Sequence, residues 1–373
     1  MRPLATVLLA LIAALSAEVA AAEPALLWRP LNEPGCGGWI TSVAVSPHEP
    51  GRVLVGGDML GVGLSEDGGE SWQSTFGFAS WEIADFTWHP TDPETVWVGT
   101  MSGPYVSTDG GRNWQSRREG FPPVAGYHYS APIQKVLFDP KDAKHLLAFG
   151  ASHRRWQSPA KALWGAVWES RDGGAAWKKL STVGGADGHG ANVLAVRFAA
   201  GSSDTLYAAA DGVGFCISTD GGRTWEIRNS GLPMEVNVNH LAAHPTQKNT
   251  VWLALGAYRH PEEPEYTPGT IYKSTDAGRT WRASGNGLGR RSTRDTNLTS
   301  RYEAISVAPT SPDTLLTCDT SWGGATLYKS ADGGASWQPL LKGRGFEAAY
   351  PAGLGATVIE FSLRDAAGNS NSP

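Results

Sequence analysis

Short runs of β-branched and aromatic residues alternate along the chain with turn-forming residues. One stretch shows the order clearly: the run Ile83–Trp88, the turn His89–Pro93, the run Thr95–Gly99 and the run Pro104–Ser107. Runs of roughly four to eight residues that are rich in Val, Ile, Trp and Tyr and bounded by Pro, Asp and Gly are typical of β-strands. No segment sustains the apolar period of about 3.6 residues that marks a helix. The pattern therefore predicts an all-β fold.

An eight-residue pattern, Ser-x-Asp-Gly/Ala-Gly-x-x-Trp, closes each group of strands and occurs six times. Its copies are Ser65–Trp72, Ser107–Trp114, Ser170–Trp177, Ser218–Trp225, Ser274–Trp281 and Ser330–Trp337. We expect a stapled hairpin in which Asp67 bonds N–H groups two residues further on, Gly69 takes a positive φ, and Trp72 covers the turn. Successive copies begin between 42 residues (Ser65 to Ser107) and 63 residues (Ser107 to Ser170) apart, which is near the repeat length of propeller blades.

These repeats predict a single β-propeller of four-stranded blades around a channel, spanning residues 23–365. Six complete repeats cover residues 40–340. The segment Trp28–Leu31 resembles the outer strand Trp337–Leu340, and Ala356–Leu363 supplies one more candidate strand, but no seventh octapeptide follows. Six and seven blades both stay open, with seven favoured and closed by the N-terminal strand. Residues 366–373, rich in Ser, Asn and Gly, are expected to form a disordered tail.

The first 22 residues have the layout of a secretory signal peptide. A positive start at Met1–Arg2 precedes the apolar run Leu4–Leu15 and the small residues Ala20–Ala22. That run is shorter than the roughly 20 residues needed to cross a bilayer, and no later segment is longer. We therefore expect a secreted or periplasmic monomer without a membrane span.

Charge and metal-binding spacing exclude several classes of partner. The formal net charge is −5, and Lys and Arg are scattered singly, so nucleic acid is not an expected partner. The nine histidines show no metal-ligand spacing, and neither a metal nor another cofactor is expected. The three cysteines, Cys36, Cys216 and Cys318, are too few and too far apart for a disulfide framework. Their disulfide state stays open, with buried single thiols favoured.

The octapeptide resembles the Asp box of the Asp-box, or BNR, propellers. That superfamily includes sialidases, family 74 glycoside hydrolases, sortilin-type receptors and a photosystem assembly factor. The resemblance covers nearly the whole mature chain. Because the Asp box is a structural staple in all these proteins, it implies the fold and leaves the function open.

The long loops are expected on the face opposite the Asp boxes. If the strands of each blade are named a to d from the channel outward, the Asp boxes are c–d turns that share a face with the short a–b turns. The long b–c and d–a loops then lie together on the other face, which we take as the candidate site because variable loops on a rigid scaffold often bind ligands. The residues expected to bind substrate there are Tyr127, His153, Arg154, Trp156, Tyr258 and Trp322. Such a mixture suits a glycan, and it also suits a peptide.

Three aspartates, Asp58, Asp211 and Asp319, occupy comparable places at the channel end of strand b. Asp58 and Asp211 each precede their Asp box by the same seven residues and lie three blades apart, so they are expected to face each other across the channel mouth. A pair of carboxylates across a cleft is what glycoside hydrolysis requires, and the two are the catalytic candidates. Asp319 is a candidate for substrate binding. In the alternative interpretation, each aspartate caps its own turn.

Two further resemblances bear on chemistry. The segments Gly37–Val43 and Gly57–Gly63 are similar to the opening of family 74 xyloglucanases, whose Asp-x-x-Gly turn carries a catalytic aspartate, which implies that role for Asp58. Those enzymes place the active site between two propellers, whereas this chain has one, so Asp211 is the best substitute for the second carboxylate. The Arg-Ile-Pro opening of sialidases is absent, and a strand through Arg301-Tyr302-Glu303 would point Tyr302 away from its neighbours.

The sequence thus favours an exported, carbohydrate-active propeller. If the protein is an enzyme, we expect a glycoside hydrolase that uses two carboxylates. The alternative is a non-catalytic scaffold that binds a protein at the same face.

Overall fold

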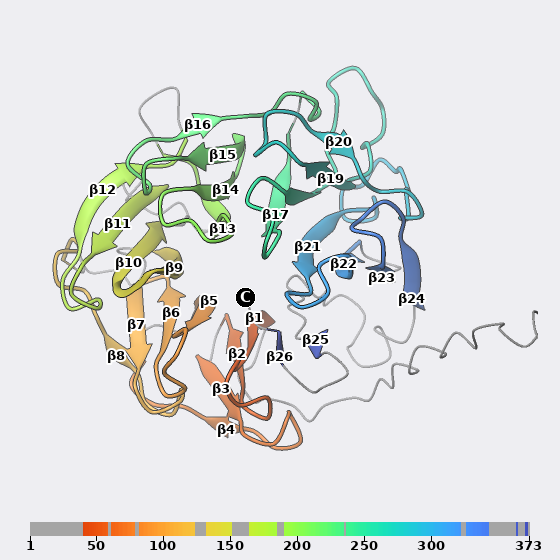
Figure 1. Ribbon diagram of the computed structural model, residues 1–373. Helices are drawn as coiled ribbons and strands as arrows, with labels where there is room; N and C mark the ends of the chain where they lie inside the picture. The colour runs from red at the N-terminus through yellow and green to blue at the C-terminus, as the bar shows by residue number, and fades with distance from the viewer. Residues whose placement is uncertain are drawn as a thin grey trace, which may run out of the picture. The chain divides into compact units, whose positions relative to one another are not determined.

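The computed structural model describes eight stretches of the chain and two short strands near its end. The stretches are 40–58, 61–78, 82–123, 132–150, 164–184, 190–234, 236–321 and 326–342, and the strands are β25 (Leu363–Arg364) and β26 (Ser370–Asn371). Within the unit Asn32–Pro373, six four-stranded sheets stand around a central channel (Figure 1). The all-β propeller expected from the sequence is confirmed.

Each blade is one antiparallel meander whose strands follow chain order from the channel outward. Blades 1 to 3 are β1 (Ile40–Val45), β2 (Val53–Gly57), β3 (Val62–Ser65), β4 (Gln73–Ser74); β5 (Ile83–Trp88), β6 (Val96–Thr100), β7 (Gly103–Ser107), β8 (Gln115–Ser116); and β9 (Ile133–Asp139), β10 (Asp142–Gly150), β11 (Ala166–Ser170), β12 (Lys178–Thr182). Blades 4 to 6 are β13 (Val193–Phe198), β14 (Leu206–Ala210), β15 (Gly214–Ser218), β16 (Glu226–Ile227); β17 (Val238–Ala243), β18 (Val251–Leu255), β19 (Ile271–Ser274), β20 (Arg282–Ala283); and β21 (Tyr302–Val307), β22 (Leu315–Asp319), β23 (Thr326–Ser330), β24 (Gln338–Lys342).

Seven blades, the number favoured from the sequence, are not supported, because the described residues form six. The segment Trp28–Leu31, expected to close the ring, lies outside the described residues. So do residues 1–22, and the signal peptide stays a prediction. The short strands β25 and β26 pair with each other in an antiparallel hairpin. No helix in the described stretches is long and apolar enough to span a membrane.

The core lies between the blades. Every residue of the second strands β2, β6, β14, β18 and β22 is buried, because each of these strands packs against a neighbouring sheet on both faces. This explains why they read as continuous runs such as VWLAL and not as alternating ones. Five apolar clusters join successive blades, from the cluster around Leu54 and Phe86 to the one around Trp252 and Ile305.

The hydrogen bonds within each Asp box fix its turn as expected, but one of them reaches further along the chain than predicted. The Oδ1 of Asp67 accepts the N–H of Ser71, four residues on and not two (2.9 Å). The hydroxyl of Ser65 donates to Asp67 (2.8 Å) and accepts the N–H of Gly69 (2.7 Å). Gly69 has a φ of 93°, as expected. The serine and aspartate bonds recur in all six boxes, so this motif fixes the c–d turn of every blade.

The tryptophan of the Asp box does more than cover its turn. Trp337 is 1% exposed, and its indole N–H donates to the backbone oxygen of Ser284 in the preceding blade (2.7 Å). Its backbone N–H also donates to Asn286 (2.8 Å). Trp114, Trp177 and Trp281 are likewise buried against the preceding blade. Each of these side chains therefore joins two blades.

Two of the three cysteines are described, and both fit the expectation of buried single thiols. Cys216 and Cys318 lie on strands β15 and β22, and both are free and buried. Cys36 lies outside the described residues.

Candidate functional site

The short a–b turns are expected on the same face of the propeller as the Asp boxes. His89 and His244 lie in these turns, and each uses Nδ1 to accept backbone N–H groups of the residues that follow, Thr91 and Asp92 for His89 (3.2 and 2.9 Å). In both histidines burial lowers the pKa, which keeps the accepting nitrogen unprotonated. These histidines hold turns and are not available as ligands.

The two catalytic candidates occupy equivalent places on opposite sides of the ring. Asp58 directly follows β2 and Asp211 directly follows β14, and both side chains are partly exposed. Blades 1 and 4 face each other across the channel (Figure 1). The turn after β2 is closed by the N–H of Gly57, which donates to the oxygen of Gly61 (3.0 Å), and Asp211 donates its N–H to Asn192 (2.8 Å).

Asp319 is not equivalent to them. It pairs with Tyr302, the first residue of its inner strand, whereas Asp58 and Asp211 each lie one residue beyond the corresponding pair in their own blades. Because side chains alternate along a strand, this difference of one residue changes the direction of the side chain. Asp319 is accordingly only 5% exposed.

The contacts of Asp319 are those of a turn cap. Its Oδ1 accepts the backbone N–H groups of Arg301 (3.2 Å) and Ser321 (3.0 Å). A carboxylate that satisfies two buried N–H groups stabilises the backbone there. The capping interpretation therefore accounts for Asp319.

Tyr302 cannot act as a sialidase-type nucleophile. Its side chain is completely buried, and its hydroxyl donates to the backbone oxygen of Gly289 (2.9 Å). Burial, with a contribution from Asp319, strongly raises the pKa of this phenol. These contacts agree with strand geometry, which points Tyr302 away from Glu303.

Tyr258 lies in an ordered part of the loop-rich face. It exchanges two backbone hydrogen bonds with Thr267 (3.1 and 2.8 Å), and Tyr266 donates its N–H to Thr293 in the next d–a loop (2.8 Å). The guanidinium carbon of Arg259 lies 5.8 Å from the ring centre of Tyr266. The b–c loop of blade 5 and the connection to blade 6 thus form one joined structure.

Tyr258 also has a second aromatic neighbour. Burial raises the pKa of the Tyr272 phenol, Tyr258 adds to that effect, and Arg290 opposes it. Tyr258, Tyr272 and Arg290 are therefore within electrostatic reach of one another beside this loop. Such a group can stack on a sugar ring and bond its hydroxyls. The other expected binding residues, Tyr127, His153, Arg154, Trp156 and Trp322, lie outside the described residues.

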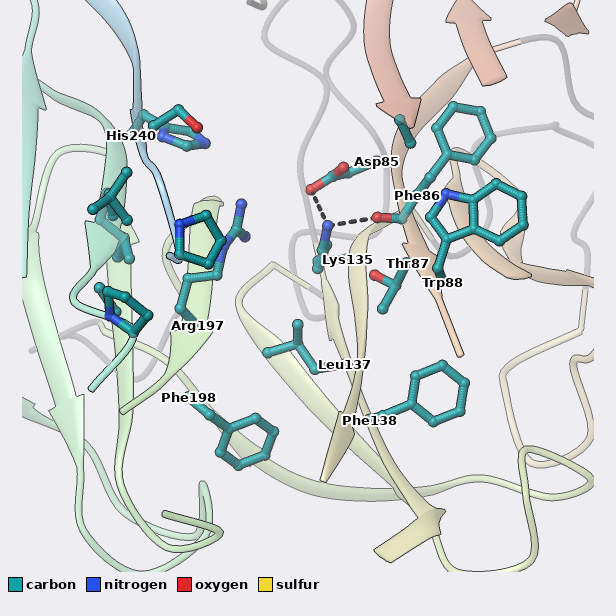
Figure 2. Close-up of a pocket in the computed structure, with 18 of the residues that line it drawn as sticks. Asp85, Phe86, Thr87, Trp88, Lys135, Leu137, Phe138, Arg197, Phe198 and His240 are labelled. Atoms are coloured by element: carbon teal, nitrogen blue, oxygen red, sulfur yellow. Dashed lines mark hydrogen bonds and ion pairs between the residues drawn. The ribbon is translucent and has the colours of Figure 1, made fainter. Parts of the chain in front are cut away.

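A polar group inside the channel was not predicted from the sequence. The cavity of about 730 Å³ is lined by the inner strands of all six blades (Figure 2). Three polar residues occupy the same place in their blades, two residues after the start of the inner strand and next to an irregularity in strand pairing. They are Asp85, Lys135 and His240. The Nζ of Lys135 lies 2.7 Å from Asp85 and donates to the oxygen of Phe86 (2.6 Å). Arg197, two residues deeper, points into the same space.

Burial in the channel lowers the pKa of His240 to about 3, with a further contribution from Arg197. His240 is therefore neutral near pH 7. The signal for this group was present in the sequence, since a charged residue in each of the apolar runs 83–88, 133–139 and 193–198 interrupts a strand that must line the channel. None of the described residues forms a cluster suited to a metal ion.

Comparisons with known proteins agree with the fold. The family model for sortilin (neurotensin receptor 3) matches residues 61–181. A xyloglucanase of Hypocrea jecorina (strain QM6a) is 30% identical over 160 residues, which is 42% of this chain and 16% of that enzyme. The chain thus spans only a small part of the curated relative that it matches.

Solved structures include an ancestral GH74 enzyme, with a TM-score of 0.62 and 24% identity over 84% of this chain and 40% of that one. YCF48 bound to a D1 peptide has a TM-score of 0.54 and 14% identity, over 85% of this chain and 87% of that one. At these identities the structural matches establish the fold alone. The described residues form a β-propeller of six Asp-box blades, similar in fold to GH74 and YCF48 propellers.

Proposed function

We propose that this propeller acts on a polysaccharide at its loop-rich face, as a glycoside hydrolase with Asp58 and Asp211 as its acid and base. The observation that carries the proposal is the equivalent placement of the two partly exposed carboxylates after β2 and β14, on opposite sides of the channel. The 30% identity to a xyloglucanase over 160 residues supports a β-glucan of the xyloglucan type as the first substrate to test.

The chemistry follows from what two carboxylic acids can do on either side of a glycosidic bond. One protonates the leaving oxygen while the other activates a water molecule. A separation of roughly 6.5 to 9.5 Å between the two carboxylates leaves room for this water and inverts the anomeric configuration. Tyr258 and its joined loops would hold the chain of sugars beside the mouth.

The test is a hydrolysis screen of the mature chain against xyloglucan, other β-glucans and sialosides. Asp58→Asn and Asp211→Asn are each expected to lower turnover by at least 100-fold, in line with the roughly 10² to 10⁴ supplied by general acid–base groups. Asp204→Asn is the matched control, because Asp204 is exposed in an a–b turn on the opposite face. Full activity in Asp58→Asn would remove this residue from the mechanism.

Export is part of the same proposal. The signal-peptide layout of residues 1–22 supports it, and a polysaccharide substrate would be met outside the cytoplasm. N-terminal sequencing of the protein recovered from the medium or periplasm should find Glu23 as the first residue. Recovery only from the cytoplasm with Met1 retained would contradict export.

A second candidate function has one specific observation in its favour. The match to YCF48 bound to a D1 peptide covers 85% of this chain and 87% of that one, whereas the GH74 match covers only 40% of the enzyme. This correspondence over most of both chains supports a peptide-binding scaffold. Absence of turnover on every glycan, together with peptide binding that is lost in Tyr258→Ala, would favour this alternative.

A further inference from the structure

The central channel contains a cation whose charge is not matched by a neighbouring carboxylate. Arg197 extends from β13 into the cavity, opposite the Asp85–Lys135 pair (Figure 2). Its Nη1 donates to the backbone oxygen of Val196 (2.9 Å), and among the described residues no carboxylate lies within 4.0 Å of it. A guanidinium has five N–H donors, so most of its donors remain for a ligand.

The other charged groups of the cavity wall have partners of their own. Asp85 binds Lys135 (2.7 Å), and Glu303 lies 3.5 Å from the Nε of Arg301. His240 is neutral near pH 7. None of these groups compensates Arg197.

Asp139, at the turn end of the cavity, is also fully engaged. One of its oxygens contacts His145 (2.8 Å), and the other accepts bonds from Ser203 (2.5 Å) and from the N–H of Lys141 (2.9 Å). The partners of Asp139 all belong to blades 3 and 4. Arg197 is therefore the lining cation, among the described residues, that lacks an anion.

The cavity below Arg197 is lined mainly by apolar side chains, and the polar lining residues there are Thr87, His89, Asp139, His244 and Ser306. Leu137 stands at the level of Arg197 on the neighbouring blade, and Phe198 follows Arg197 in sequence. The turn end is lined by Trp88, Phe138, Val307 and the prolines Pro47, Pro90, Pro140, Pro245 and Pro309. The volume of about 730 Å³ falls within the roughly 300 to 1,000 Å³ of sites for small molecules.

We propose that the channel binds a small organic anion with an apolar body, whose carboxylate or phosphate group pairs with Arg197 while the apolar part lies against Leu137 and Phe198. A guanidinium forms strong, two-pronged hydrogen bonds with either group. Arg197 is only partly buried, so its guanidinium remains accessible to a ligand in the channel. This site is separate from the loop-rich face and does not depend on the function proposed there.

The test compares four probes on the full mature chain by calorimetry: octanoate, octyl phosphate, octan-1-ol and acetate. One of the two amphipathic anions should bind at least tenfold more tightly than octan-1-ol, which lacks the charge, and than acetate, which lacks the apolar chain. The stronger of the two identifies the anionic group. Equal binding of octanoate, octyl phosphate and octan-1-ol would overturn the proposal, because the charge would then not be recognised. No binding of either anion would also overturn it and would leave a channel that holds water only.

Variants locate the site. Arg197→Met keeps the length of the side chain and should weaken binding of the preferred anion at least tenfold, since a charge-assisted bond is lost. Arg282→Met, on the exposed outer strand β20, is the matched control and should bind as the wild type does. Unchanged affinity in a folded Arg197→Met protein would contradict the proposal.

If Arg197→Met does not fold, Phe198→Ala tests the same site, because it should weaken octanoate or octyl phosphate while leaving acetate unchanged. Equal loss for all probes, or no loss, would count against it. Asp58→Asn should leave anion binding intact. Failure of the glycosidase proposal and failure of this one are therefore distinguishable.

Discussion

The Nζ of Lys135 lies 2.7 Å from the Oδ2 of Asp85 and joins the inner strands of blades 2 and 3 across the wall of the channel. The two side chains are 8% and 20% exposed, so both charges are largely removed from water. The lysine also donates to the backbone oxygen of Phe86 (2.6 Å), which fixes its position. This contact is the basis of the first prediction.

Lys135→Met should destabilise the protein by roughly 3 kcal/mol, because breaking a buried pair leaves the Asp85 charge uncompensated. Urea unfolding followed by tryptophan fluorescence measures the change. The matched control is Lys144→Met, which removes an exposed lysine of β10 in the same blade and should change stability by less than about 0.5 kcal/mol. Equal effects of the two substitutions would show that the pair contributes nothing to stability.

The tryptophans of the Asp boxes should differ in their contribution to stability. Trp337→Ala should lower the free energy of unfolding by roughly 3 to 5 kcal/mol, since it empties a buried site between blades 5 and 6 and removes the bond to Ser284. Trp72→Ala should cost clearly less, because Trp72 is partly exposed and bonds within its own box, to Gly69 (3.1 Å). Denaturant midpoints of the two variants provide the comparison. A larger loss in Trp72→Ala would contradict the role given to the inter-blade position.

Much of the fold could be predicted from the sequence, because the residues of each Asp box form hydrogen bonds with one another. The serine, aspartate and glycine of one octapeptide fix a turn without help from distant residues, so the six copies mark six blades. The seventh blade, favoured from the flanking segments that carry no octapeptide, is not supported. The sequence did not predict that Trp337 packs into the core of the preceding blade, because that contact joins residues more than 50 positions apart in the chain.

The site was harder to predict than the fold, because the direction of each side chain depends on how its strand pairs with the next one. The equivalence of Asp58 and Asp211 followed from counting back to the Asp box, and the strand pairing agrees with it. That count does not apply to Asp319, whose position depends on pairing with Tyr302 across the blade. The group around Lys135 was missed because an isolated charge in an apolar strand does not reveal which partner a neighbouring blade supplies.

The buried thiols should be unreactive in the folded protein. Burial raises the pKa of Cys216 to about 12 and also raises that of Cys318. Because the thiolate is the reactive form, labelling of these two residues at pH 8 should be at least 100-fold slower in native buffer than in urea. Peptide mapping after a timed reaction with iodoacetamide separates them from Cys36. Rapid native labelling of Cys216 would show that blade 4 opens at equilibrium.

Acid should destabilise the propeller through its Asp boxes. Hydrogen bonds from Ser71 lower the pKa of Asp67 from its ordinary 3.8 to about 2, and Ser336 does the same for Asp332. For Asp276, burial opposes the charged form, but bonds from Thr280 outweigh it and the pKa is again about 2. A group whose pKa is lower in the folded state stabilises that state above its unfolded pKa and loses this contribution as pH falls through the folded value.

The melting temperature should therefore stay nearly constant from pH 7 to about 5 and fall between about pH 4 and pH 2. Asp276→Asn removes one of these titrations while keeping an oxygen that can accept the N–H of Thr280. This variant should be less stable than the wild type at pH 7 and should lose less between pH 5 and pH 2. An identical loss in both proteins would mean that this Asp box contributes nothing to the acid sensitivity. Asp139 and Glu169 would then be the next carboxylates to test, because hydrogen bonds lower their pKa values despite burial.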